Sequence, residues 1–177
     1  QKRVQELQIG DYVLTSKGAL PIKWVARRTI HRYNTLAAKY IESLPVRIEA
    51  HSLGNGLPMR DLLVSESHGL YVDGRIVNAS CLVNHVNIHK EQLAAHPFFI
   101  QYFHLEFDDE VLVWANGVGA CSYVNEGNRR GFDNYPEFVS LYVNADSSVG
   151  SHVYKHPRNH PSLQGHKNRV RRSWGAV

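Results

Sequence analysis

Ser65 and His68 are the residues whose types and spacing first suggest chemistry in this sequence. They stand three positions apart in the tetrad Ser65-Glu66-Ser67-His68, so a hydroxyl and an imidazole share one short polar segment. Such a pair can hold a backbone carbonyl or amide and move one proton near neutral pH, where histidine ordinarily titrates. The alternative interpretation is a solvated loop whose histidine has no chemical role.

Two short apolar runs must position this tetrad. Residues 62–64 precede it, residues 70–72 follow it, and both runs have the length and composition of strands. Asp73-Gly74 is then a tight-turn signal before the next apolar run at residues 75–77. The pattern predicts a strand, a sharp polar corner, a second strand and a hairpin.

The rest of the chain is dominated by short alternating segments separated by turn residues. Pro21 favours an edge strand, and residues 34–41 are expected to form a short helix or an insertion loop. Many short strands without strand–helix–strand alternation predict an all-β domain. Further strands are expected at residues 12–15, 20–25, 46–50, 75–83, 86–88, 101–107 and 110–118.

The formal net charge of +4 comes from the C-terminal end of the chain. No acidic residue follows Asp146, so the basicity belongs to a tail, and we expect no specific nucleic-acid-binding face on the domain. No apolar run reaches the length of about eighteen residues that a membrane-spanning helix needs. No signal peptide starts the chain, and the missing initiating Met leads us to expect that Gln1 is not the natural start. The cationic residues of the tail are Lys155, Arg158, Lys167, Arg169, Arg171 and Arg172.

Three further residues could take part in chemistry. His104 lies in the alternating segment 101–107, where it is either a proton carrier or a structural hydrogen-bonding residue. Cys81 and Cys121 are the two cysteines, and they form either one disulfide or two small buried thiols.

We expect no metal and no cofactor. His85 and His89 have the spacing of a helix face, but the surrounding pattern predicts a strand or loop, which argues against a metal site. The tail histidines His156, His160 and His166 alternate with Pro and Gly too irregularly for a zinc motif. A serine hydrolase is also disfavoured, because no nucleophile-elbow motif surrounds Ser65 or Ser67.

Several stretches taken together carry a family resemblance. Characteristic among them are Glu6–Thr15 (ELQIGDYVLT), Asp61–Leu70 (DLLVSESHGL), Ala115–Val118 (ANGV) and Gly127–Arg129 (GNR). In their order and spacing they resemble the Hint domains, the self-processing modules of hedgehog proteins, inteins and bacterial intein-like proteins. The similarity is closest to the bacterial Hint_2 type and covers roughly residues 4–132. The other matching stretches are residues 21–28, 45–48, 53–58 and 102–106 and Ser122-Tyr123.

The resemblance implies a compact, pseudo-twofold all-β fold. Residues 1–132 would form the Hint-like domain, without its N-terminal nucleophile strand, and residues 133–177 an irregular, basic and His-rich C-terminal extension. It also implies an N–S or N–O acyl shift, in which a Cys or Ser opening the domain attacks the preceding peptide bond. The resulting thioester or ester is then cleaved by water, a thiol, an amine or another nucleophile.

The resemblance also assigns roles to individual residues. His68 matches the residue that protonates the scissile nitrogen, and Ser65 matches a hydrogen-bonding positioner. His104 stands where inteins often carry an acid, which makes it a candidate proton carrier. Cys121 is either a thioester relay or a plain core thiol.

Three departures from the family pattern qualify the expected activity. The acyl-shifting Cys of the family lies a strand and a turn before the segment that Val4–Leu7 matches. We therefore expect the nucleophile to lie upstream of Gln1. We also expect that this polypeptide alone does not carry out the acyl shift. Inteins end in His-Asn, whereas residues 120–122 here read Ala-Cys-Ser, so Asn-driven cleavage is not expected. The histidine that inteins carry near residues 110–111 is missing.

Two functional hypotheses follow. The first is an autocatalytic self-processing domain that releases or transfers an N-terminal segment. The second is a degenerate Hint fold that acts as a non-catalytic binding or structural module and uses its basic tail as a contact arm. The expected partner is the upstream segment of the same precursor or a cleaved partner chain. By resemblance to bacterial Hint proteins, we expect a secreted or cell-surface location.

Overall fold

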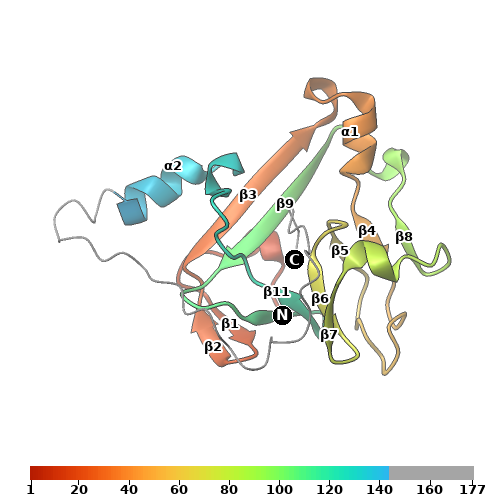
Figure 1. Ribbon diagram of the computed structural model, residues 1–177, viewed down its shortest axis with the longest axis horizontal. Helices are drawn as coiled ribbons and strands as arrows, with labels where there is room; N and C mark the ends of the chain where they lie inside the picture. The colour runs from red at the N-terminus through yellow and green to blue at the C-terminus, as the bar shows by residue number, and fades with distance from the viewer. Residues whose placement is uncertain (144–177) are drawn as a thin grey trace.

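Antiparallel strands form most of the structure, a computed structural model that describes residues 1–143 (Figure 1). This arrangement confirms the prediction of an all-β domain. The strands are β1 (Tyr12–Thr15), β2 (Gly18–Pro21), β3 (Trp24–His31), β4 (Val46–Ile48), β5 (Leu62–Val64), β6 (Gly69–Val72), β7 (Arg75–Asn78), β8 (Ile88–Lys90), β9 (Phe99–Glu106), β10 (Leu112–Ala115) and β11 (Val118–Cys121).

Helical structure is short in the described part of the chain. The segment expected to be a short helix or a loop contains helix α1 (Ala37–Glu42), and α2 (Tyr135–Phe138) begins with a proline near its first position, where the missing N–H costs nothing. A π-helical turn, η6 (Val139–Val143), follows α2. The 3₁₀ turns are η1 (Val4–Glu6), η2 (Arg32–Asn34), η3 (Ala79–Leu82), η4 (Leu93–Ala95) and η5 (Arg129–Gly131).

The strands form three sheets. The six-stranded sheet has the order β2-β1-β10-β11-β6-β7, the two-stranded sheet pairs β3 with β9, and the three-stranded sheet has the order β5-β4-β8. Pro21 ends β2, an edge strand, as its missing N–H predicted. The β3–β9 pair is the longest and extends to the end of the molecule where α1 lies (Figure 1).

Two hairpin turns have the same backbone conformation. Asp73 and Gly74 have φ angles of 48° and 78° and join β6 to β7, which confirms the predicted hairpin. Asn116 and Gly117, with φ angles of 49° and 88°, join β10 to β11 in the same way. The prediction of one continuous strand over residues 110–118 was therefore wrong. Its physical reason is that Asn-Gly readily adopts the two positive φ angles of a two-residue hairpin.

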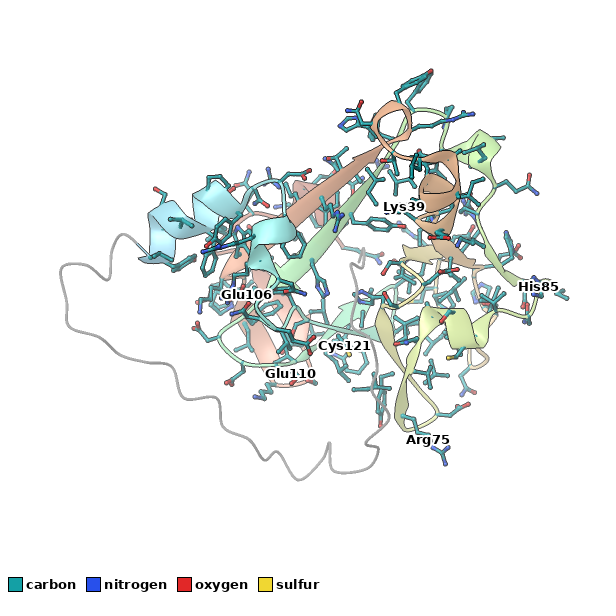
Figure 2. All side chains as sticks on the ribbon, turned by 45° about the horizontal axis from the view of Figure 1, so that its top comes forward. Lys39, Arg75, His85, Glu106, Glu110 and Cys121 are labelled. Atoms are coloured by element: carbon teal, nitrogen blue, oxygen red, sulfur yellow. The ribbon has the colours of Figure 1, made fainter. Side chains whose placement is uncertain are left out.

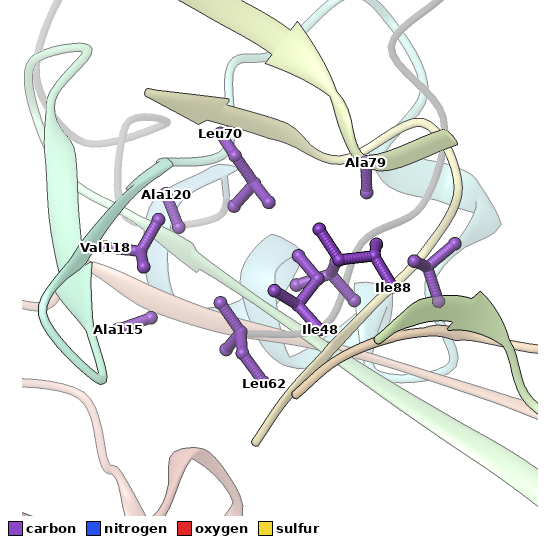
Figure 3. Packing of buried hydrophobic residues seen from close by; sticks show 10 residues of the cluster. Ile48, Leu62, Leu70, Ala79, Ile88, Ala115, Val118 and Ala120 are labelled. Carbon is purple, nitrogen blue, oxygen red and sulfur yellow. The ribbon is translucent and has the colours of Figure 1, made fainter. Parts of the chain in front are cut away.

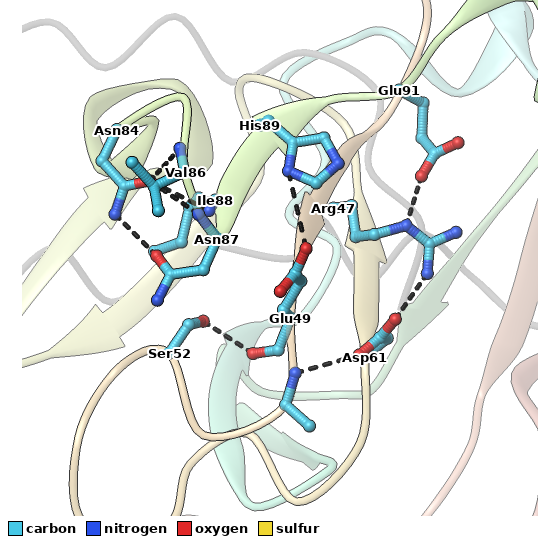
Figure 4. Close-up of polar contacts among 11 residues, drawn as sticks. Arg47, Glu49, Ser52, Asp61, Asn84, Val86, Asn87, Ile88, His89 and Glu91 are labelled. Carbon is cyan, nitrogen blue, oxygen red and sulfur yellow. Dashed lines mark hydrogen bonds and ion pairs between the residues drawn. The ribbon is translucent and has the colours of Figure 1, made fainter.

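Two other predicted strands have different bounds from those expected, one shorter and one shifted. β7 ends at Asn78, and η3 occupies the positions that were expected to continue it. β8 begins only at Ile88, because the Asn84 side-chain oxygen accepts hydrogen bonds from the backbone amides of residues 86–88 (Figure 4). These bonds fix a loop where the alternation predicted a strand.

The core anchors both ends of the polar corner. A cluster of buried residues lies between the three-stranded sheet and strands β6, β10 and β11 (Figure 3). Val64, just before the corner, and Leu70, just after it, are both fully buried in this cluster. The corner is therefore held from both sides by packed side chains. The cluster consists of Val46, Ile48, Leu62, Val64, Leu70, Ala79, Ile88, Ala115, Val118 and Ala120.

Residues 133–143 pack against strand β3. The Asn134 side chain accepts a hydrogen bond from the Arg27 amide at 2.8 Å and donates one to the Val25 carbonyl at 2.9 Å. The ring centroid of Phe138 lies 5.1 Å from that of Trp24. The domain boundary after residue 132 stays a prediction, and the basic tail with His156, His160 and His166 lies outside the described residues.

Candidate active site

The corner that carries Ser65 and His68 is a closed backbone turn between β5 and β6. The His68 amide donates to the Ser65 carbonyl at 3.0 Å, and the Ala79 amide donates to the His68 carbonyl at 3.0 Å. A further bond joins the Ser80 amide to the Glu66 carbonyl at 2.8 Å. Turn η3 therefore fixes the corner from outside while the core holds its ends.

Both corner side chains are buried, so the interpretation as a solvated loop is wrong. Ser65 is 8% exposed and His68 is 2% exposed. Within residues 1–143, the Ser65 hydroxyl and both ring nitrogens of His68 have no hydrogen-bond partner. A buried polar atom without a partner costs about 1–3 kcal/mol, so three together at one corner are expensive to retain. Such groups are typical of a site that binds another polar group.

Burial also changes the protonation of His68. Removal from water lowers the pKa of His68 to about 4, because the imidazolium loses its hydration. The expectation that this histidine titrates near neutral pH was therefore wrong. At pH 7 about one molecule in a thousand carries the imidazolium, and the ring is otherwise neutral.

The fold brings His104 next to His68. The two ring centroids are 5.1 Å apart and the rings are inclined by 41°. His104 lies on β9 opposite Ala26, and its buried Nδ1 also has no hydrogen-bond partner. Burial, and secondly the proximity of His68, lower the pKa of His104 well below its usual value. The structure thus places Ser65, His68 and His104 in one region with two neutral imidazoles.

Tyr123 is part of this region and was missed as a site residue. Its ring meets that of His104 edge to face, with centroids 5.4 Å apart and planes at 70°. The phenol donates a short hydrogen bond to the side-chain oxygen of Asn128, and burial raises the Tyr123 pKa to about 12. The available signal was that Ser122-Tyr123 belongs to a stretch resembling the Hint family.

A buried ion pair lies two residues along β9 from His104. Arg129 donates to both carboxylate oxygens of Glu106, from Nε at 3.0 Å and from Nη2 at 2.5 Å. Glu106 is 3% exposed, and Lys23 lies 3.9 Å from the same carboxylate. The guanidinium of Arg129 also stacks 4.2 Å above the ring of Phe138. The carboxylate charge near the histidines is therefore compensated.

The two cysteines do not form a disulfide. Cys81 is exposed in η3, so the expectation of a small buried thiol does not hold there. Cys121 is partly buried on β11, beside the hairpin that carries Arg75 (Figure 2). Since neighbouring side chains of a strand alternate, Cys121 faces away from the side on which Ala120 packs in the core. The Cys121 sulfur nevertheless lies close to Gly69, the residue after His68, because a Cβ added at Gly69 would be 2.9 Å from it. The thioester relay stays a prediction.

His85 and His89 are held in different local structures. His85 occupies a turn with a φ angle of 60°, whereas His89 lies on β8 with its Nδ1 3.9 Å from a Glu49 carboxylate oxygen (Figure 4). Among residues 1–143, no group of three or more His, Cys, Asp and Glu side chains is arranged to hold a metal ion.

An open groove of about 960 Å³ runs along the N-terminal segment. Its lining comes from the N-terminal residues and from parts of β1, β5, β9 and β10, and it is more apolar than polar. Gln1 lies along it and donates from Nε2 to the Asn116 side-chain oxygen at 2.7 Å. Ser65, His68 and His104 do not line this groove, but β5 leads from it directly into the corner. Its apolar lining residues include Leu7, Leu62, Phe103, Leu105 and Val113.

The fold of short antiparallel strands around a buried corner is consistent with an all-β Hint fold. Comparison with known families agrees: residues 1–127 match the Hint_2 family model, a Hint domain. The chain therefore belongs to the Hint domain family, whose members have self-processing or related roles. No curated protein and no solved structure matches the sequence. None of the helices in the described part of the chain is long and apolar enough to span a membrane.

Proposed function

We propose that this chain is an autocatalytic processing module that acts on the peptide bond preceding the Hint domain. The single observation that supports this most is the set of buried polar atoms without partners on Ser65, His68 and His104. They are suited to receive the amide of an incoming segment. The nucleophile is a Cys or Ser of the precursor upstream of Gln1.

In the proposed first step, the nucleophile's sulfur or oxygen forms a bond to the carbonyl carbon of the peptide bond before it. The carbon–nitrogen bond breaks, and the freed nitrogen becomes an amine. The nucleophile loses one proton and the departing nitrogen gains one, so the step is balanced. Water, a thiol or an amine then cleaves the resulting thioester or ester and releases the upstream segment.

Neutral His68 is suited to carry that proton. A mechanism that starts from imidazolium would use only about one molecule in a thousand at pH 7, given a pKa of about 4. A neutral imidazole instead accepts the proton of the nucleophile and returns it to the leaving nitrogen. We assign Ser65 to orient the peptide bond through its hydroxyl, and His104 to accept or pass the proton beside His68.

The apolar groove is the proposed seat of the upstream segment. It lies beside Gln1, and its lining includes Leu62, which is three residues before Ser65. An extended segment of ten residues spans up to about 35 Å, so a strand in the groove can lead a preceding residue to the corner. The place that ends in His-Asn in inteins reads Ala-Cys-Ser at residues 120–122 here, and the Ser122 hydroxyl accepts a hydrogen bond from the Val111 amide at 3.0 Å. We therefore propose cleavage at the N-terminal junction alone.

The test is expression of the natural precursor, including the residues before Gln1, followed by electrophoresis and intact-mass measurement. We expect cleavage immediately before the nucleophile, and His68→Ala should slow it by about a hundredfold or more, the usual range for a general acid–base group. Ser65→Ala should slow it less. His31→Ala, at an exposed position on β3, is the control and should cleave at the parental rate. Unchanged cleavage in His68→Ala would refute the proposed role.

A second candidate is a non-catalytic module that binds an upstream segment or a cleaved partner chain, and the groove favours it. In that case the precursor stays uncleaved, and a separate upstream peptide binds the chain without covalent change. Assembly through the basic tail would appear as weaker association after deletion of residues 147–177. That loss would depend on salt if charge dominates.

A further inference from the structure

The far end of the β3–β9 pair exposes an unusual set of large apolar side chains. Tyr33 in η2 is 83% exposed and Leu36, just before α1, is 72% exposed. On the neighbouring segment, Phe98 and Phe99 are 62% and 52% exposed. Ile41 of α1 adds a fifth at 48% exposed. Clusters of this kind in the surface of a folded domain usually mark an interaction site. We call these five residues the apolar tip.

The backbone holds the tip in a fixed arrangement. His31 pairs with Phe99 at the end of the two strands, and the Arg32 amide donates to the Phe98 carbonyl at 2.9 Å. The Arg32 guanidinium also donates to the Pro97 carbonyl at 3.3 Å. The apolar side chains from two separate segments are therefore presented together, at the end of the molecule where β3, β9 and α1 meet (Figure 1).

Two cations, Arg32 and Lys39, lie on the segment that carries Tyr33, Leu36 and Ile41. Residues 29–41 contain Arg32 and Lys39 and no carboxylate, and residues 93–103 contain neither a carboxylate nor a Lys or Arg. The nearest carboxylates are Glu42, which follows Ile41 at the last position of α1, and Asp133, which accepts a hydrogen bond from the Thr29 amide at 2.6 Å. Lys39 of α1 is exposed. Without Arg32 and Lys39, residues 1–143 contain more acidic than basic residues.

We propose that this tip inserts into the interface of an anionic lipid surface. Aromatic and aliphatic side chains enter the headgroup–acyl boundary, while Arg32 and Lys39 keep their charged ends among the anionic headgroups. A stable protein interface buries about 800 Å² and involves about 20–30 residues on each partner, many more than the five side chains of the tip. A narrow apolar tip flanked by cations fits a lipid surface better than a protein partner.

The experiment measures vesicle binding of the full chain by flotation, using vesicles of phosphatidylcholine with about 30% phosphatidylserine and vesicles of phosphatidylcholine alone. We expect binding to the anionic vesicles. The double variant Tyr33→Ser/Leu36→Ser should have a coefficient for partition onto the anionic vesicles that is lower by at least about tenfold, because two apolar side chains no longer enter the lipid interface. The double variant Arg32→Gln/Lys39→Gln should bind less tightly to the anionic vesicles and should bind unchanged to the vesicles of phosphatidylcholine alone.

The matched control is Tyr12→Ser/Leu14→Ser, which removes the same residue types at 75% and 63% exposure on β1. It should bind as the parent chain does. A Phe98→Trp reporter should show a blue shift in fluorescence on anionic vesicles, which reports insertion directly. Absence of vesicle binding, or equal binding by Tyr33→Ser/Leu36→Ser, would overturn the proposal. Equal binding by this double variant would mean that basic residues elsewhere in the chain bind the vesicles. The tip would then be a candidate surface for a protein partner.

Discussion

The buried imidazole of His68 should make the stability of this domain depend on pH in a way that one substitution removes. Histidine ordinarily has a pKa of about 6.5, and burial lowers the pKa of His68 to about 4. Between these two values the unfolded chain binds more protons than the folded chain does. Stability is therefore full above about pH 6.5 and is lost as the pH falls toward 4.

The magnitude follows from the two pKa values. On lowering the pH from about 7.5 to about 5, the free energy of unfolding should fall by about 2 kcal/mol through His68 alone. His104, whose pKa is also lowered by burial, adds to the loss in the same direction. His68→Phe retains an aromatic ring but has no titrating group at this position. Its free energy of unfolding should therefore fall by about 2 kcal/mol less than that of the parent chain over the same change in pH.

Urea unfolding at the two pH values, followed by tryptophan fluorescence, measures these differences. Val64→Ala is the control, because Val64 is buried beside the corner and does not titrate. It should lower stability about equally at both pH values. If His68→Phe lost as much stability on acidification as the parent chain, the reasoning about a neutral buried imidazole would be refuted.

Two further predictions concern the elements that support the site. Arg129→Met leaves the buried Glu106 carboxylate poorly compensated and should cost about 3 kcal/mol or more in urea unfolding, whereas adding Glu106→Gln should recover part of the loss. An equal loss in the single and double variants would contradict this. Gly117→Ala should cost about 1 kcal/mol more than Gly74→Ala, because both glycines have positive φ but only at Gly117 would the new Cβ lie 2.6 Å from Leu57 Cδ2, a side-chain end that must then move. Equal thermal unfolding midpoints would contradict the predicted clash.

Local signals explain which parts of the fold could be predicted. The predictions of a corner at residues 65–68 and of a hairpin at Asp73-Gly74 were correct, because apolar runs and turn residues within a few positions specify both features. The Asn116-Gly117 hairpin carried the same signal, but the apolar residues on both sides of it suggested one long strand. η3 was missed because the bonds that stabilise it, such as Ser80 to Glu66, come from outside the segment.

The residues of the candidate site could be predicted from the sequence, but their burial, their mutual contacts and their pKa values could not. Ser65 and His68 are neighbours in sequence, whereas His104 reaches them only through the pairing of β9 with β3. Burial of the corner depends on packing by Val64 and Leu70 into a core formed from distant strands, so the low pKa of His68 could not be inferred locally. The contact of Tyr123 with His104 depends on the same tertiary arrangement.

One measurement addresses the acyl shift itself. The natural precursor, including the residues before Gln1, is incubated with hydroxylamine, which attacks esters and thioesters, and the products are weighed by mass spectrometry. The proposed chemistry predicts release of the upstream segment as its hydroxamate from the parent protein, and an uncleaved precursor when His68 is replaced by Ala. Equal hydroxamate formation in both proteins, or none in the parent, would contradict an amide-activating role for this buried corner.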